Sequence, residues 1–131
     1  LETSAQGTAF LKVTRDAWGC DVIDQATTAL GRDVAYPVAV AIAAAGHGID
    51  KSASLHAFLH GVVANLVSAG VRLIPLGQTD GQHALAELES PVSETAAQAL
   101  NASIDEIGGI AMLSDIAAMK HETQYTRLFR S

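Results

Sequence analysis

The chain has 131 residues, enough for one domain with a packed core. Only 5% of the residues are aromatic while 49% are hydrophobic, so the core must come from Leu, Val, Ile and Ala, and Ala favours helix. The formal net charge of -6 argues against nucleic acid, which requires a basic face. The single cysteine, Cys20, cannot form an intrachain disulfide, is typical of a reducing compartment and is expected to be a small buried side chain.

Three helices are predicted in the first third of the chain. The first covers residues 3–18, with Leu11 and Trp18 on its apolar face, and the second covers residues 21–30. Residues 36–45 are apolar nearly all round, with a proline in the first turn and glycines after the last. A helix that is apolar on every side is expected to be fully buried.

The strongest helical periodicity runs over residues 52–74. Apolar residues follow the i, i+3, i+4, i+7 rule without a break, Asp50 is suited to the N-cap, and Pro75 marks the end. The opposite face carries polar residues that argue against a transmembrane span, although the stretch is long enough for one. These polar residues are His56, His60, Asn65, Ser68 and Arg72.

After Pro75 the pattern predicts a turn, a helix to about residue 88, and a new helix that starts at Ser90–Pro91 and runs to about residue 104. A hinge at Gly108–Gly109 precedes a short helix over residues 112–119. No stretch alternates in the manner of a strand. The predicted fold is all-α, an orthogonal or irregular bundle of about six to seven helices with a C-terminal tail. We divide it into a helical domain of residues 1–119 and a tail of residues 120–131.

Charge and composition set this tail apart from the rest of the chain. It holds three basic residues against one acidic residue, whereas the first 119 residues hold five basic and 13 acidic residues. Tyr, Arg and Phe are the residue types that anchor protein interfaces. We therefore expect the tail to dock on a partner, although it could instead pack on its own domain. The residues expected to bind are His121, Glu122, Gln124, Tyr125, Arg127, Leu128, Phe129 and Arg130.

Catalytic and metal chemistry receive little support from the residues. His56 and His60 stand four residues apart on one helix face, a spacing that can chelate a metal, but Ala57 replaces the Glu of a zinc-protease motif and no third ligand is obvious. A polar face packed on a neighbouring helix is the simpler interpretation. Cys20 has no evident base beside it in the sequence. We predict no enzyme activity and no bound cofactor, with a helical metal-binding protein using His56 and His60 as the alternative.

Four blocks of the sequence together resemble the UreF family. The tail matches the segment that ends the chain in that family, with Lys120 in place of Arg and Thr126 in place of Ser. The other blocks occur in the order of the family and extend the resemblance over nearly the whole chain; they are residues 2–7, 36–39 and 65–82. The family's N-terminal portion has no counterpart, and Leu1 stands where a Met would begin a complete chain. We expect a processed or truncated protein.

The resemblance implies a urease accessory protein that is all-α, cytoplasmic and dimeric in its full-length form. UreF proteins bind UreD, also called UreH, and that complex recruits the GTPase UreG to deliver nickel to apo-urease. Nickel is then handled by the assembled complex and is not firmly held by this chain. The resemblance also assigns the C-terminal segment to UreD binding. A further alternative is that the protein supplies an arginine to the GTPase, with Arg72 or Arg130 in that role.

Overall fold

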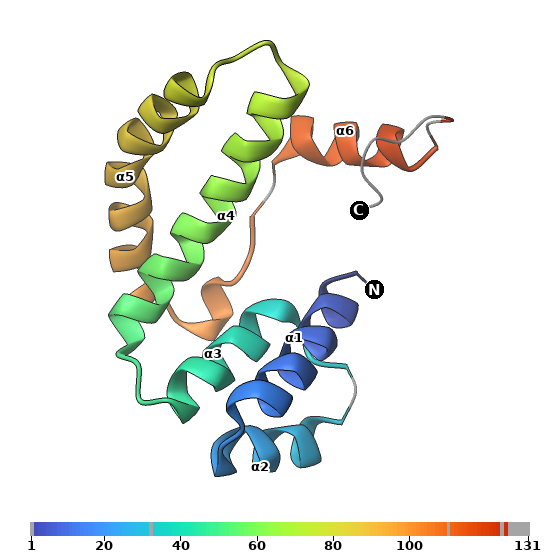
Figure 1. Ribbon diagram of the computed structural model, residues 1–131, viewed down its shortest axis with the longest axis vertical. Helices are drawn as coiled ribbons and strands as arrows, with labels where there is room; N and C mark the ends of the chain where they lie inside the picture. Colours follow the sequence, from blue (N-terminus) through green and yellow to red (C-terminus); the bar gives the residue numbers. More distant parts are fainter. Residues whose placement is uncertain (1, 32, 110, 124, 126–131) are drawn as a thin grey trace. The chain divides into compact units, whose positions relative to one another are not determined.

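The computed structural model describes residues 2–31, 33–109, 111–123 and 125, and for Glu122 the backbone alone. Within these ranges every regular element is helical, which confirms the all-α prediction (Figure 1). The α-helices are α1 (Glu2–Trp18), α2 (Asp21–Leu30), α3 (Tyr36–Gly46), α4 (Lys51–Leu73), α5 (Gln78–Asn101) and α6 (Met112–Glu122). A 3-10 helix, η1 (Ile104–Glu106), precedes α6. Residues 1–101 and 102–131 form two separate compact units.

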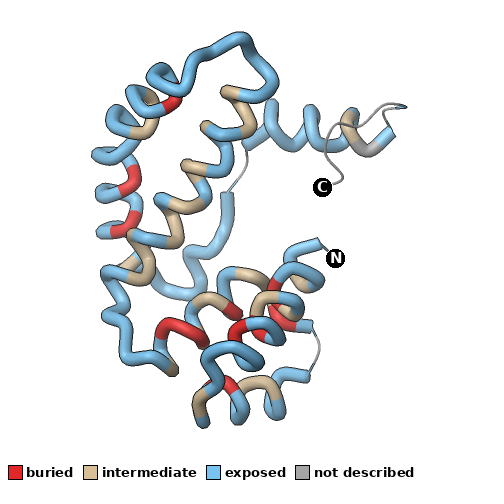
Figure 2. Tube along the Cα trace, in the orientation of Figure 1, coloured by how far each residue is buried: buried red, intermediate tan, exposed pale blue. Residues whose placement is uncertain are grey.

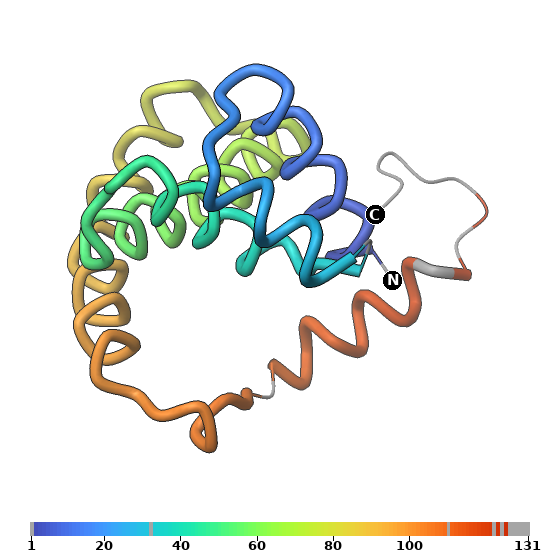
Figure 3. The backbone as a smooth tube through the Cα atoms, turned by 90° about the horizontal axis from the view of Figure 1, so that it is seen from below, coloured from blue at the N-terminus to red at the C-terminus, as the bar shows by residue number. Residues whose placement is uncertain are grey.

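The first three helices of the first unit share one buried core. Leu11, Ile23, Val34, Ala39 and Ala43 make up this core, with Cys20 packed against it as a half-buried thiol. Figure 2 shows most of the buried positions on α1 to α3, and Figure 3 shows α1 and α3 side by side from a second direction. The small side chains of the core permit this close approach of helices.

Glycine sets the closest of these approaches. A Cβ on Gly7 of α1 would lie 2.0 Å from the carbonyl oxygen of Val34, so only glycine fits where α1 crosses the start of α3. The backbone N–H of Tyr36 donates to the hydroxyl of Thr3 over 3.3 Å at the same crossing. The beginning of α1 is therefore fixed beside the beginning of α3.

Helix α3 differs from its prediction. Ala39, Ala43 and Ala44 are buried, but Pro37, Val38, Ala41 and Ala45 are exposed, so the expectation of a fully buried helix is wrong. The reason lies in the tertiary packing around α3. α1 and α2 cover one face of α3, and within residues 1–101 the contact with α4 leaves part of its other face open. A helix that is apolar on every side can be buried on any side, but the pattern does not show that every side is covered. In α3 one side remains exposed.

Helices α4 and α5 form an antiparallel hairpin with little burial on α4. Asp50 caps α4 as predicted, because its carboxylate accepts from the Ala53 N–H over 3.1 Å. No residue of α4 is buried, although α5 packs along it. Gly81 of α5 lies so close that a Cβ there would be 2.9 Å from Val71. Helix α4 is also long and apolar enough to cross a membrane by length and composition, a test that core helices pass as well.

The predicted break at Ser90–Pro91 is wrong, because α5 continues through Pro91 as a single helix. Proline inside a helix loses one backbone hydrogen bond and costs about 3 kcal/mol relative to alanine. Val92, directly after it, and Ala96, about one turn later, are buried, so packing in the hairpin offsets the cost. The helix then ends at Asn101, three residues earlier than predicted, where Ser103 and Glu106 form a capping box for η1.

The second unit contains η1 and α6. Helix α6 extends to Glu122, three residues past its predicted end, so it includes the first residues of the predicted tail. The division into a domain of residues 1–119 and a tail of residues 120–131 stays a prediction. The boundary between the two compact units follows Asn101.

Candidate partner-docking surfaces

Helix α6 presents an apolar stripe to solvent within the second unit. Met112, Ile116 and Met119 follow the i, i+4, i+7 spacing that places side chains on one helix face, and all three are exposed. Leu113 beside them is 84% exposed. A helix of 11 residues that leaves four large apolar side chains in water is suited to docking on another surface.

The tail that follows is described only in part. His121 is half-buried at the end of α6, and the Thr123 hydroxyl donates to the Lys120 carbonyl over 3.2 Å. The side chain of Tyr125 is completely exposed. The remaining residues predicted to bind, as well as the side chain of Glu122, lie outside what the structure describes; these residues are Gln124, Arg127, Leu128, Phe129 and Arg130. Their assignment to partner binding stays a prediction.

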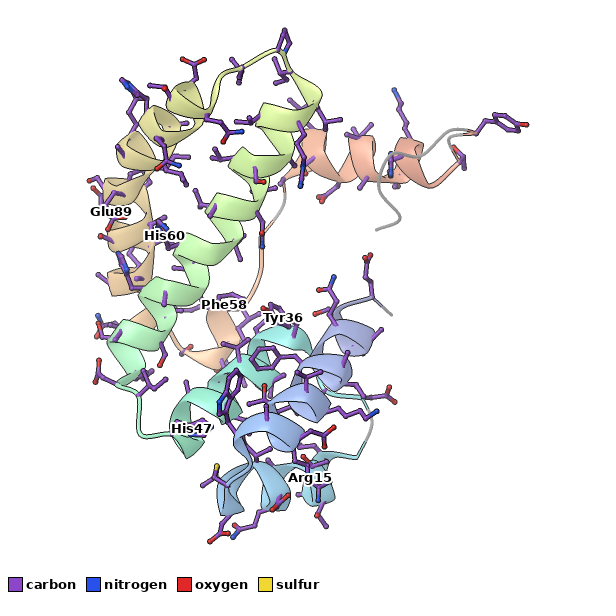
Figure 4. All side chains as sticks on the ribbon, viewed as in Figure 1. Arg15, Tyr36, His47, Phe58, His60 and Glu89 are labelled. Carbon is purple, nitrogen blue, oxygen red and sulfur yellow. The ribbon has the colours of Figure 1, made fainter. Side chains whose placement is uncertain are left out.

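His56 and His60 of α4 both lie near the carboxylate of Glu89 on α5. Figure 4 labels His60 and Glu89 on these neighbouring helices. His56 Nε2 lies 3.0 Å from one oxygen of Glu89 and 3.1 Å from the Ser93 hydroxyl, and His60 Nδ1 lies 3.7 Å from the other Glu89 oxygen. Glu89 was not among the residues that the sequence singled out as a partner of the two histidines. Only the hairpin register brings these side chains together.

This cluster serves best as a polar bridge between the two helices. All three side chains are between one-third and one-half exposed, which limits an ion pair to a small contribution. Across the described ranges, no group of three or more His, Cys, Asp or Glu side chains is arranged to hold a metal ion. The geometry therefore adds no support for the metal-binding alternative. Arg72 lies in the last turn of α4 and lines a hollow of about 340 Å³ with mixed polar and apolar walls.

An apolar groove lies between α3 and the first half of α4. It has a volume of about 600 Å³ and is walled by Val40 and Ala44 of α3, Leu55 and Phe58 of α4, and Ala99 of α5. A second hollow of about 320 Å³ shares the Val40, Ala44 and Phe58 walls. Sequence analysis missed this groove, because it treated α3 as fully enclosed.

Comparison with known proteins shows which family the chain resembles. The UreF family model matches residues 1–89 of the chain, which include α1 to α4 and half of α5. The chain belongs to the UreF family. The resemblance suggested by the residue blocks within residues 1–89 is thereby confirmed as a family relationship.

Curated UreF proteins align with the whole of this chain. Proteins named urease accessory protein UreF from Rhodopseudomonas palustris strains TIE-1 and HaA2 are each 53% identical over 131 residues. The one from Bradyrhizobium diazoefficiens is 50% identical over the same length. Each alignment covers 100% of this chain and 54 or 55% of the relative, so the chain spans about half the length of the UreF proteins it matches.

Proposed function

We propose that this chain is the partner-docking part of a urease accessory protein. In this role it is a scaffold without catalytic activity, which binds UreD through α6 and the residues that follow it. The UreD complex then recruits the GTPase UreG for nickel insertion into apo-urease. Nickel insertion takes place in the cytoplasm, and the full-length protein acts as a homodimer. The chain itself does not bind nickel firmly.

The observation that carries this proposal is the apolar stripe of α6 followed directly by an exposed tyrosine and a basic tail. A short segment that orders on binding loses conformational entropy, so it needs strong anchors. Met112, Ile116 and Met119 offer apolar area, and Tyr125 offers a rigid ring with a polar tip. Arg127 and Arg130 add donors suited to carboxylates.

Family membership supports the same role. Relatives that share half of the residues over this whole chain are named urease accessory proteins. Within the described ranges, neither a metal-binding group nor an unpartnered buried polar side chain suggests a competing chemical site. A docking role therefore explains the exposed surfaces with the fewest assumptions.

The test is a pull-down of the chain with UreD of Rhodopseudomonas palustris, in the presence and absence of UreG. We expect the intact chain to retain UreD, and deletion of residues 127–131 to abolish retention while far-UV circular dichroism stays unchanged. Tyr125→Ala should weaken binding by about 2–4 kcal/mol if the ring is a buried anchor. Full-affinity binding by the deletion variant would sink the proposal.

A matched control comes from Trp18, an exposed aromatic residue of α1 in the first unit. Trp18→Ala removes a comparable ring from the same protein, far along the chain from α6. We expect it to leave UreD retention unchanged. Equal losses from Trp18→Ala and Tyr125→Ala would mean that UreD does not depend on the C-terminal residues in particular.

A further inference from the structure

Both methionines of the chain lie on one face of α6. Met112 and Met119 are the only two in the sequence, and their positions differ by about two turns of the helix. Their side chains are 66% and 64% exposed, so small solutes in the surrounding water reach both thioether groups. Ile116 lies between them on the same face. The apolar stripe of α6 therefore has a thioether near each of its ends.

An exposed thioether reacts with hydrogen peroxide. The sulfur attacks one peroxide oxygen, an S–O bond forms as the O–O bond breaks, and the second oxygen takes up a proton and leaves in water. The sulfur loses two electrons in this step, and the peroxide gains them. The product is methionine sulfoxide, whose side chain is polar where that of methionine is apolar.

Oxidation changes what the stripe of α6 can bury. A docked methionine contributes apolar area and packs adaptably against an irregular surface. A sulfoxide oxygen instead needs a hydrogen-bond donor, and leaving it unpaired in an interface opposes association. Leu113 and Ile116 of the same stripe carry only hydrocarbon side chains, which peroxide does not attack. The reaction therefore changes the stripe at two defined positions.

Cys20 holds the remaining sulfur atom of the chain, and its surroundings are different. Its side chain is half-buried and packs against the core of α1 to α3. A Cβ on Gly46 would lie 2.6 Å from the Cys20 Sγ, so the thiol lies directly against the backbone of α3. Oxidation of this thiol would act within residues 1–101, whereas the stripe belongs to the second unit. Substitution can therefore separate the two kinds of sulfur.

We propose that Met112 and Met119 form a reversible oxidation site that controls docking by α6. Hydrogen peroxide converts both to sulfoxides and weakens the binding of UreD. Methionine sulfoxide reductases restore binding: the sulfoxide oxygen leaves in water, and two thiols of the reducing system become a disulfide. The inference rests on the proposed docking of α6 on UreD, and it adds a covalent switch to that surface.

The test measures UreD binding before and after oxidation. The chain is treated with hydrogen peroxide, catalase removes the excess, and isothermal titration calorimetry gives the affinity for UreD of Rhodopseudomonas palustris. We expect oxidation of both methionines to weaken binding by at least about tenfold, because two polar groups then lie in the interface. Far-UV circular dichroism should stay unchanged. The two reductases, one for each sulfoxide epimer, should restore the affinity of the untreated chain.

Substitutions assign the effect to particular sulfur atoms. The double variant Met112→Leu, Met119→Leu has no thioether, and peroxide should leave its affinity equal to that of its own untreated form. Val13→Met in this double variant is the matched control, since Val13 on α1 is 63% exposed, close to the value for Met112. Peroxide should oxidise the added thioether, as mass spectrometry can show, without weakening UreD binding. Cys20→Ala in the parent chain should leave the peroxide effect intact.

Four results would overturn the inference. The first is unchanged affinity although mass spectrometry shows sulfoxide at both methionines, and the second is a peroxide effect that the reductases do not reverse. The third is an effect that persists in the double variant or disappears with Cys20→Ala. The fourth is a fall in helicity that accompanies the lost binding, because peroxide would then act on folding.

The reductase experiment uses the unaltered sequence, so it decides the matter even where the double variant binds UreD too weakly to measure. Failure of the untreated chain to bind UreD is a separate result, seen before any peroxide is added. It would refute the proposed docking itself, and this inference with it. Binding that survives oxidation would refute the inference alone.

Discussion

The α1–α3 cluster and the α4–α5 hairpin are built from similar residues but use them differently. The cluster encloses a contiguous core in which Ile23 is 0% exposed, whereas α4, the more regular apolar pattern of the two, buries no residue. Apolar periodicity therefore shows which face of a helix is suited to packing, but the surface that packs on it can lie outside the chain. We therefore expect the cluster to contribute most of the stability and the hairpin to offer an exposed apolar surface.

The largest loss of stability is expected from a substitution in the buried core of the α1–α3 cluster. Ile23→Ala removes the side chain at the centre of the cluster and should lower the free energy of unfolding by about 3 kcal/mol, measured by urea denaturation. Leu66→Ala on the hairpin should change it by less than about 0.5 kcal/mol, because that side chain is already in water. Similar losses from both would show that α4 is covered in solution.

Two Gly→Ala substitutions test the same difference between the α1–α3 cluster and the α4–α5 hairpin. Gly7→Ala forces a methyl group against the Val34 carbonyl and should cost about 2 kcal/mol of stability. Gly61→Ala places the methyl group in open space inside a helix, where alanine is favoured over glycine, and should add about 0.5–1 kcal/mol. Thermal unfolding of both variants measures the difference. A loss at Gly61 would contradict the open groove.

Pro91 tests how the hairpin holds together. Pro91→Ala restores a backbone hydrogen bond within α5 and should stabilise the chain by about 1 kcal/mol, part of the full penalty of a helical proline. The measurement is the midpoint of chemical denaturation together with helicity by circular dichroism. A destabilised variant would mean that the proline shapes α5 for its packing on α4.

A small effect is also expected from the His56–Glu89 bridge. His56→Ala should lower stability by less than about 1 kcal/mol, since both side chains are substantially exposed. A calorimetric nickel titration of the parent chain should show no tight stoichiometric site that the variant loses. Tight binding abolished by His56→Ala would instead revive the metal-binding alternative.

Local signals predicted much of this fold. Asp50 and Pro75 place the ends of α4 within one residue of those observed, because capping and proline act on neighbouring backbone groups. The same local rules failed at Pro91, where packing of Val92 and Ala96 continues the helix. Trp18, predicted on the apolar face of α1, is exposed for a related reason: periodicity does not show how far a neighbouring helix extends.

The candidate surfaces also differ in how far the sequence could predict them. Composition identified the C-terminal tail and its family signature, since both are properties of consecutive residues. The groove could not be predicted, because it depends on which side of α3 its neighbours leave open. The pairing of His56 and Glu89 likewise depends on the hairpin register across 33 residues of chain.

Hydrogen–deuterium exchange of this chain with and without UreD tests the central claim most directly. If function lies in docking surfaces outside the cluster, UreD should slow exchange in α6 and the residues after it, while exchange in α1–α3 stays unchanged. Slower exchange confined to α1–α3, or no change anywhere at saturating UreD, would contradict the account.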